Sequence, residues 1–361
     1  MFWLYAGFVL FVLGLLALDL GVFHRKAHVV SVREALGWSL FWIVLGLAFT
    51  LFVYAGYEQH WVGLGLSPDL MSTDPRVLDN GVLVYNDGAS AALKYVTGYL
   101  VEKSLAVDNI FVISMLFAFF AVPPLYQHRV LFWGILGALL MRGAMIAAGA
   151  VMIQQFSWII YLFGGFLVVT GVKMLFLKSQ GSDLAGNIVV RLTRKIFPIT
   201  DHYHGEHFFV RAGSAKSREA AVPGAAVVRD AVVEVASPGV WLATPLFLAL
   251  VMVEVTDVVF AVDSIPAIFA ITADPFLVFT SNVFAILGLR SLYFALAGMI
   301  DKFRFLKVSL AVILILVGVK MMIHIWLKSL LGENFNLILL GAVVAILAAG
   351  IIASLSAPGK R

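Results

Sequence analysis

The sequence predicts an all-α polytopic membrane protein, with about nine transmembrane helices and an inverted repeat of three-helix units. Of its 361 residues, 62% are apolar and only 13% are charged, whereas charged residues make up about 25% of soluble domains. Nine apolar runs are long enough to cross a bilayer, which takes roughly 20 residues. In addition, two parts of the chain repeat each other in sequence.

The apolar runs follow one another closely, except for one long gap in the middle of the chain. They lie near residues 2–23, 36–57, 90–121, 130–153, 156–177, 241–271, 276–299, 305–327 and 335–355. The first run resembles a signal peptide, but it lacks a basic start and an Ala-x-Ala cleavage site and it contains Asp19. We therefore interpret it as a retained first span.

Basic residues gather in alternate connections and in the tail at Lys360 and Arg361. Because basic loops stay in the cytoplasm, this pattern predicts an outside N-terminus and a cytoplasmic C-terminus. The predicted parts are a membrane domain over 1–177 with two N-terminal spans and the first three-helix repeat, a cytoplasmic loop over 178–240, a second three-helix repeat over 241–328, and a last span with the tail over 329–361.

Three short phrases occur twice in the same order. The pairs are LAVDNI (105–110) with FAVDSI (260–265), ILGALLMR (135–142) with FAILGLR (284–290), and GVKM at both 171–174 and 318–321. At this offset Glu102 corresponds to Asp257, and Asp108 to Asp263. An odd number of spans per unit, spans 3–5 and 6–8, makes the second copy enter the membrane from the opposite side. Transporters built in this way bind substrate near mid-membrane, between the repeats.

Acidic residues interrupt these apolar runs. They are Glu102, Asp108, Glu254, Asp257 and Asp263. A carboxylate near the bilayer centre costs on the order of 2.5–3.5 kcal/mol, so the group predicts a cation, a proton or a water-filled path. Asn109 and Ser264 add oxygen ligands beside the second acid of each repeat. Such oxygens suit Mn²⁺, Mg²⁺ and Ca²⁺, and a chain without cysteine excludes thiolate sites.

Helix geometry limits how these acids can meet. Residues six apart lie about 120° apart around an unbroken helix, so Glu102 and Asp108 cannot face one point. Either the helices unwind there, or the acids form two successive stations along a path. Pro266 favours a helix break just after Asp263. The acids also carry more charge than one divalent ion neutralises, so some must be protonated or paired, which offers a route to proton antiport.

The basic residues inside the spans have structural interpretations. We expect Arg142 and Arg290 to form supporting ion pairs with the acids or to cap a neighbouring helix. Lys173 and Lys320, near span ends, are expected to extend to the membrane interface. Asp19 is expected to make a helix-end or interhelical contact.

The connection over 178–240 contains a histidine cluster, with His202, His204 and His207. These residues could bind metal, but we favour a solvated loop whose strand over 208–210 touches the membrane domain. The segment between Ala212 and Ser237 has the composition of a flexible insertion.

These motifs resemble the TerC/Alx family of bacterial membrane proteins, which is related to the LysE-type exporters. The resemblance rests on Glu102 with SLAVDN (104–109), YHG (203–205) with FFVR (208–211), ATPL (243–246), Glu254 with DVVFAVDSIP (257–266), TSN (280–282) leading to ILGLR (286–290), and Asp19 with RKAH (25–28). It implies export of Mn²⁺ across the bacterial inner membrane, linked to metal supply and to the response to alkaline pH. Some members of the family carry a tellurite-resistance name.

The leading hypothesis is therefore a secondary transporter that exports a divalent metal, Mn²⁺ above Ca²⁺ or Mg²⁺, in exchange for protons. Its partners are the ion, protons and the bilayer, with no resident cofactor and, at a net charge of +4, no nucleic acid. We expect no enzyme activity, since no nucleophile set or phosphate-binding loop is present. The alternatives are a Ca²⁺/H⁺ exchanger, or a tellurite-resistance-associated scaffold that binds protein partners through the loop 178–240.

Overall fold

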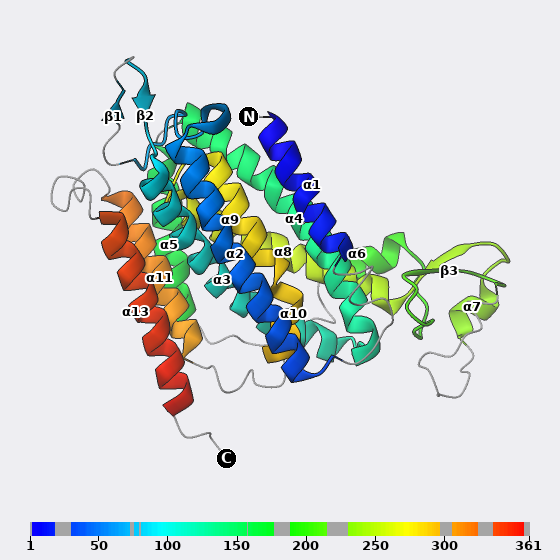
Figure 1. The fold of residues 1–361 in the computed structure, drawn as a ribbon. Coiled ribbons are helices and arrows are strands. Elements are labelled where there is room, and N and C mark those ends of the chain that lie inside the picture. Colours follow the sequence, from blue (N-terminus) through cyan, green and yellow to red (C-terminus); the bar gives the residue numbers. More distant parts are fainter. Residues whose placement is uncertain are drawn as a thin grey trace.

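Each apolar run forms a helix, or a pair of helices joined at a bend, in a computed structural model of the chain (Figure 1). The structure describes residues 2–18, 30–72, 76–78, 81–156, 158–176, 188–214, 230–296, 305–323 and 335–356. The helices of the membrane bundle are α1 (Phe2–Leu18), α2 (Val32–Glu58), α3 (Gly88–Phe119), α4 (Pro124–Gln155), α5 (Ile159–Phe176), α8 (Pro245–Phe269), α9 (Pro275–Leu287), α10 (Leu289–Leu296), α11 (Leu306–Met322) and α13 (Phe335–Ser356).

Five of the described helices are long and apolar enough to cross a membrane, namely α2, α4, α5, α8 and α13. The pair α9 and α10, bent by 40°, makes a sixth. Helices α1 and α11 are shorter, with 17 residues each, and α3 carries charged residues such as Lys94, Glu102 and Asp108 inside its length. The membrane class is thus confirmed, whereas the total of nine spans stays a prediction.

Prolines and aspartates mark where several of these helices begin. Pro124, Pro245 and Pro275 occupy the first turns of α4, α8 and α9, where a missing backbone N–H is harmless. Asp87 caps α3 by accepting a hydrogen bond from the Ser90 amide at 2.8 Å.

The helix break predicted after Asp263 is wrong, because α8 continues through Pro266 to Phe269. The last turns of α8, from Ser264 onward, are fully buried. Their packing maintains the helix although one hydrogen bond is lost. The bend lies instead at Gly288, between α9 and α10, where a Cβ atom would come within 2.7 Å of Lys103 Nζ.

The two predicted repeat units pack against each other reciprocally. Helix α3 packs against α9 and α8 packs against α4, while α3 also contacts α8 and α5 lies along α11. A two-fold relation between α3–α5 and α8–α11 requires this pairing. The inverted repeat stays a prediction that the pairing supports. Helix α2 covers α3 and α10, and α13 covers α11 and α3.

Short strands precede α3 and α8 at opposite ends of the bundle (Figure 1). A hairpin of β1 (Arg76–Val77) and β2 (Leu83–Val84) leads into α3, after the short 3₁₀ turn Trp61–Gly63. A lobe with α6 (Ile188–Ile196), β3 (Phe209–Arg211), α7 (Ala231–Val235) and β4 (Trp241–Ala243) leads into α8. Residues 241–243, predicted as the start of a span, form a strand antiparallel to β3, because Pro245 sets the first helical turn.

Candidate functional site

The guanidinium of Arg142, on α4, joins carboxylates from the two repeat units. Its Nη2 and Nε donate to Asp257 Oδ1 and Oδ2 at 3.0 and 3.1 Å. Its Nη1 donates to a carboxylate oxygen of Glu102, and to Ser264 Oγ at 3.3 Å. Arg142 and Glu102 are only 2% and 1% exposed. Two-pronged contacts of this kind are the strong form of an arginine–carboxylate pair, so one arginine holds α3, α4 and α8 together.

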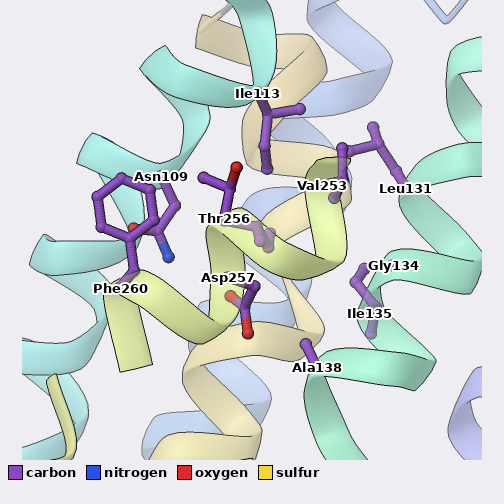
Figure 2. A pocket seen from close by; sticks show the side chains of 11 residues that line it. Asn109, Ile113, Leu131, Gly134, Ile135, Ala138, Val253, Thr256, Asp257 and Phe260 are labelled. Carbon is purple, nitrogen blue, oxygen red and sulfur yellow. The ribbon is translucent and has the colours of Figure 1, made fainter. Parts of the chain in front are cut away.

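Asp257 also lines a cavity between these same helices (Figure 2). The cavity is small, with about 20 Å³ of room for the centre of a water-sized sphere. Its polar lining consists of Asn109 from α3 and of Thr256 and Asp257 from α8, and the remaining lining is apolar, for example Ile113 and Phe260. The cavity therefore places an amide, a hydroxyl and a carboxylate around one small space.

The cavity lies to one side of the Arg142 pair along the helix axes. On α3 it is lined by residues that follow Glu102, and on α4 by Leu131 to Ala138, which precede Arg142. Both sets lie toward the turn between α3 and α4. Of the residues in the Arg142 ion pair, Asp257 is the one that lines the cavity.

Glu254 occupies a separate position one turn before Asp257 on α8. Its carboxylate lies against Gly137 of α4, in the space that a Cβ atom at that position would need. Glycine at 137 therefore allows the carboxylate to fit between the two helices.

Asp108 and Asp263 do not join the Arg142 pair. Asp263 accepts a hydrogen bond from Thr170 Oγ1 of α5 at 3.2 Å, and Asp108 is half-buried on α3. Because α3 and α8 are unbroken, acids six residues apart point in different directions. Among the described residues, no group of three or more histidines and acids is arranged to hold a metal ion. Asp108 lies beyond Glu102 toward the α3–α4 end, and Asp263 lies beyond Asp257 toward the α8–α9 end. The acids are therefore spread along the helices rather than gathered in one cluster.

The other basic residues inside the spans are Lys320, Lys173 and Arg290, and their surroundings differ. Lys320 is buried and donates to the carbonyl of Ala270, so the prediction that it extends to the membrane interface is wrong. The carbonyl at the end of α8 binds the ammonium more favourably than lipid could. Lys173, its counterpart in the repeat, is exposed. Arg290 is buried directly after the bend at Gly288, and Asp19 lies outside the described residues.

A second buried polar network is centred on Asp69 and was not predicted from the sequence. Asp69 precedes α3 and accepts hydrogen bonds from Lys94 Nζ at 2.8 Å, Asn86 Nδ2 at 3.0 Å, Thr272 Oγ1 at 2.7 Å and the Ala273 amide at 2.8 Å. Burial raises the pKa of Asp69, but the Lys94 ammonium and these hydrogen bonds outweigh burial and hold it below its usual range. The only signal in the sequence was Lys94, a charge inside an apolar run.

Asp274 lies beside this network, and its pKa is shifted in the opposite direction. Its Oδ1 accepts from the amides of Phe276 and Leu277 at 3.0 and 3.4 Å and so caps α9. Complete burial and the nearby negative charge of Asp69 raise the pKa of Asp274 to about 6.

Comparison with known proteins gives the membrane bundle a family. Residues 87–361 match the model described as "Integral membrane protein TerC family". The chain belongs to the TerC family. An uncharacterized membrane protein of Myxococcus xanthus is 45% identical to this TerC chain, over 98% of this chain and 92% of its own. Proteins named "Putative membrane-bound redox modulator Alx" are 42% identical in Salmonella typhi and 41% identical in Escherichia coli K12, each over 94% of this chain and 93% of its own.

No solved structure matches the TerC chain. The family match and the apolar helices together show a multi-pass integral membrane protein. The Alx relatives confirm the resemblance seen in the sequence.

The histidine cluster of the TerC chain helps to fold the lobe before α8. Asp230 accepts a hydrogen bond from the His202 amide at 2.9 Å and lies 3.3 Å from His204 Nε2. Burial opposes its ionisation, but these donors and the Val233 amide hold the pKa of Asp230 below its usual range. The lobe touches the membrane bundle through Phe209, whose ring lies 4.5 Å from that of Phe247.

Proposed function

We propose that this TerC protein is a secondary transporter, which exports a divalent cation, first of all Mn²⁺, across the bacterial inner membrane in exchange for protons. One observation carries the proposal: Glu102 and Asp257, which correspond in the two repeats, meet on one buried arginine beside a cavity. Ionisable groups inside a membrane bundle are costly and usually mark an ion or proton path. The basic loops favour an outside N-terminus and a cytoplasmic C-terminus.

In the described conformation Arg142 supplies the positive charge that the transported ion would supply in another. The guanidinium carries one positive charge, whereas Glu102 and Asp257 together can carry two negative charges. A cation in the cavity would contact Asp257, with the oxygens of Asn109 and Thr256 beside it. Its binding favours loss of protons from neighbouring acids, because the cation stabilises their charged forms. Proton return from the other side would then release it.

The choice of cation follows from the ligand atoms and from the family resemblance. Carboxylate, amide and hydroxyl oxygens suit Mn²⁺, Ca²⁺ and Mg²⁺ alike. Mn²⁺ takes precedence because of the resemblance to the TerC/Alx family. The Alx relatives are named as redox modulators, but a chain without cysteine offers no thiol for such a role.

Efflux from proteoliposomes loaded with Mn²⁺ tests this proposal. We expect Glu102→Gln and Asp257→Asn to abolish proton-driven efflux, because each removes a charge next to Arg142. Asp108→Asn and Asp263→Asn, on opposite sides of the Arg142 pair, are expected to abolish it as well. Glu34→Gln, in the first turn of α2 and away from the cavity, should leave efflux nearly intact. Efflux at the wild-type rate in the Glu102 and Asp257 variants would overturn the proposal, and competition by Ca²⁺ separates the two exchangers.

A further inference from the structure

Helix α6, in the lobe before α8, has three distinct faces. Val190 and Thr193 are buried against the bundle. A second face exposes the apolar side chains of Ile188, Leu192 and Ile196, which are 71%, 56% and 61% exposed. At about 100° per residue these three cover a sector of roughly 80°. The third face carries Arg191, Arg194 and Lys195, all exposed, and the helix contains no acidic residue.

The position of α6 relates it to the beginning of a membrane helix. The side chain of Val190 belongs to the same buried cluster as Leu246, in the first turn of α8. Phe197, directly after α6, packs its ring 5.4 Å from that of Phe247 in the same turn. Trp241, just before α8, is 64% exposed. Tryptophan is enriched where membrane helices meet water, and both Trp241 and α6 adjoin the first turn of the membrane helix α8.

We propose that α6 lies in this interface and binds the headgroups of anionic phospholipids. Its apolar face is directed to the acyl boundary and its basic face to the lipid phosphates, with the third face held by the bundle. This arrangement is typical of helices that lie in the plane of a membrane surface. The three cations complement an anionic leaflet, and the exposed apolar stripe runs beside them. The inference needs only a membrane-embedded bundle and does not depend on the transported ion.

The absence of native cysteine allows a direct test in the full-length chain. A spin label at Leu192→Cys reports whether the apolar face contacts lipid, through its relative accessibility to oxygen and to a water-soluble nickel chelate. The protein is reconstituted in phosphatidylcholine vesicles with and without phosphatidylglycerol. Val235→Cys on α7 is the matched control, because Val235 is apolar and 88% exposed but has Glu234 rather than cations beside it.

We expect the label at position 192 to favour oxygen several-fold over the chelate in vesicles with phosphatidylglycerol, and labels at Arg194→Cys and Val235→Cys to favour the chelate. Replacing Arg191, Arg194 and Lys195 by glutamine should remove the effect of phosphatidylglycerol at position 192, with helix content unchanged. A label at 192 that is as accessible to the chelate as the label at 235 overturns the proposal. Spin–spin broadening between copies, which would indicate a protein interface instead, also overturns it.

Discussion

At the scale of single residues, the shared arginine determines how the site can work. Arginine offers several N–H donors in a planar group and can therefore serve two carboxylates at once, which a lysine cannot do with the same geometry. Arg142 contacts both Glu102 and Asp257 in a nearly dry environment. Both acids can therefore stay charged only while a positive charge lies between them.

The first prediction is that Arg142→Met destabilises the fold by about 3–5 kcal/mol, because it leaves two buried acids without their partner. Thermal unfolding in detergent measures this loss. Adding Glu102→Gln and Asp257→Asn to Arg142→Met should recover most of it, since the uncompensated charge is then gone. Unchanged unfolding of Arg142→Met alone would contradict the interpretation of this pair.

The second prediction concerns Asp274, whose pKa is raised to about 6. The folded state binds a proton more tightly than the unfolded state, so this residue lowers stability as pH rises from the ordinary aspartate range through about 6. The loss amounts to roughly 3 kcal/mol. Asp274→Asn keeps the cap of α9 but has no titrating carboxyl. Its unfolding temperature should therefore fall less than that of the parent protein as pH rises through this range.

The matched control for Asp274 is Asp69→Asn, at the neighbouring acid with the lowered pKa. Asp69 stabilises the fold above its ordinary pKa and loses this effect as pH falls. Asp69→Asn should therefore destabilise at neutral pH, in contrast to Asp274→Asn. Equal effects of the two variants at neutral pH would contradict the assignment.

At the scale of helices, the sequence was informative wherever apolar length and repetition decide the structure. The helices lie where the apolar runs predicted them, and the match between Glu102 and Asp257 anticipated that these residues share an environment. The break predicted from Pro266 does not occur, because the packing of the buried helix end outweighs the loss of a single hydrogen bond. The Asp69 network could not be predicted, because Asp69 and Thr272 are 203 residues apart and Asp69 lies in a connection.

The third prediction tests the close contact of α5 with α11. A Cβ atom at Gly164 would come within 2.9 Å of the Gly318 carbonyl, whereas one at the adjacent Gly165 would meet nothing within 4 Å. Gly164→Ala should therefore destabilise by about 1–3 kcal/mol, as overpacked sites do. Gly165→Ala should be neutral or slightly stabilising, since alanine favours the helix. Thermal unfolding in detergent compares them, and equal effects would mean that α5 and α11 are less closely packed.

At the scale of the whole molecule, the segment before each repeat unit closes on the helical turn of the other unit. Asp69, before α3, binds Thr272 and Ala273 in the turn between α8 and α9. Tyr203, before α8, donates its hydroxyl to the carbonyl of Phe120, in the turn between α3 and α4, at 2.6 Å. The first contact is a fully buried network with an ion pair. The second is a hydrogen bond to a neutral group, next to a half-exposed ion pair between Arg129 and Glu206 at 3.2 Å. The two ends of the bundle thus differ in how firmly they are closed.

The last prediction follows from this difference and from the position of the cavity, which lies toward the α3–α4 end. Thr256→Cys, in the cavity lining, should react with a membrane-impermeant maleimide from that face only, and Val235→Cys in the lobe identifies which face it is. Lys94→Met should increase labelling at position 256 from the opposite face, because it removes the ion pair to Asp69. Thr272→Val, which removes a single hydrogen bond to Asp69, should have the same effect to a smaller degree. Equal labelling from both faces in the parent Thr256→Cys protein would show that the Asp69 network does not close the α8–α9 end of the bundle. The proposed difference between the two ends would then be wrong.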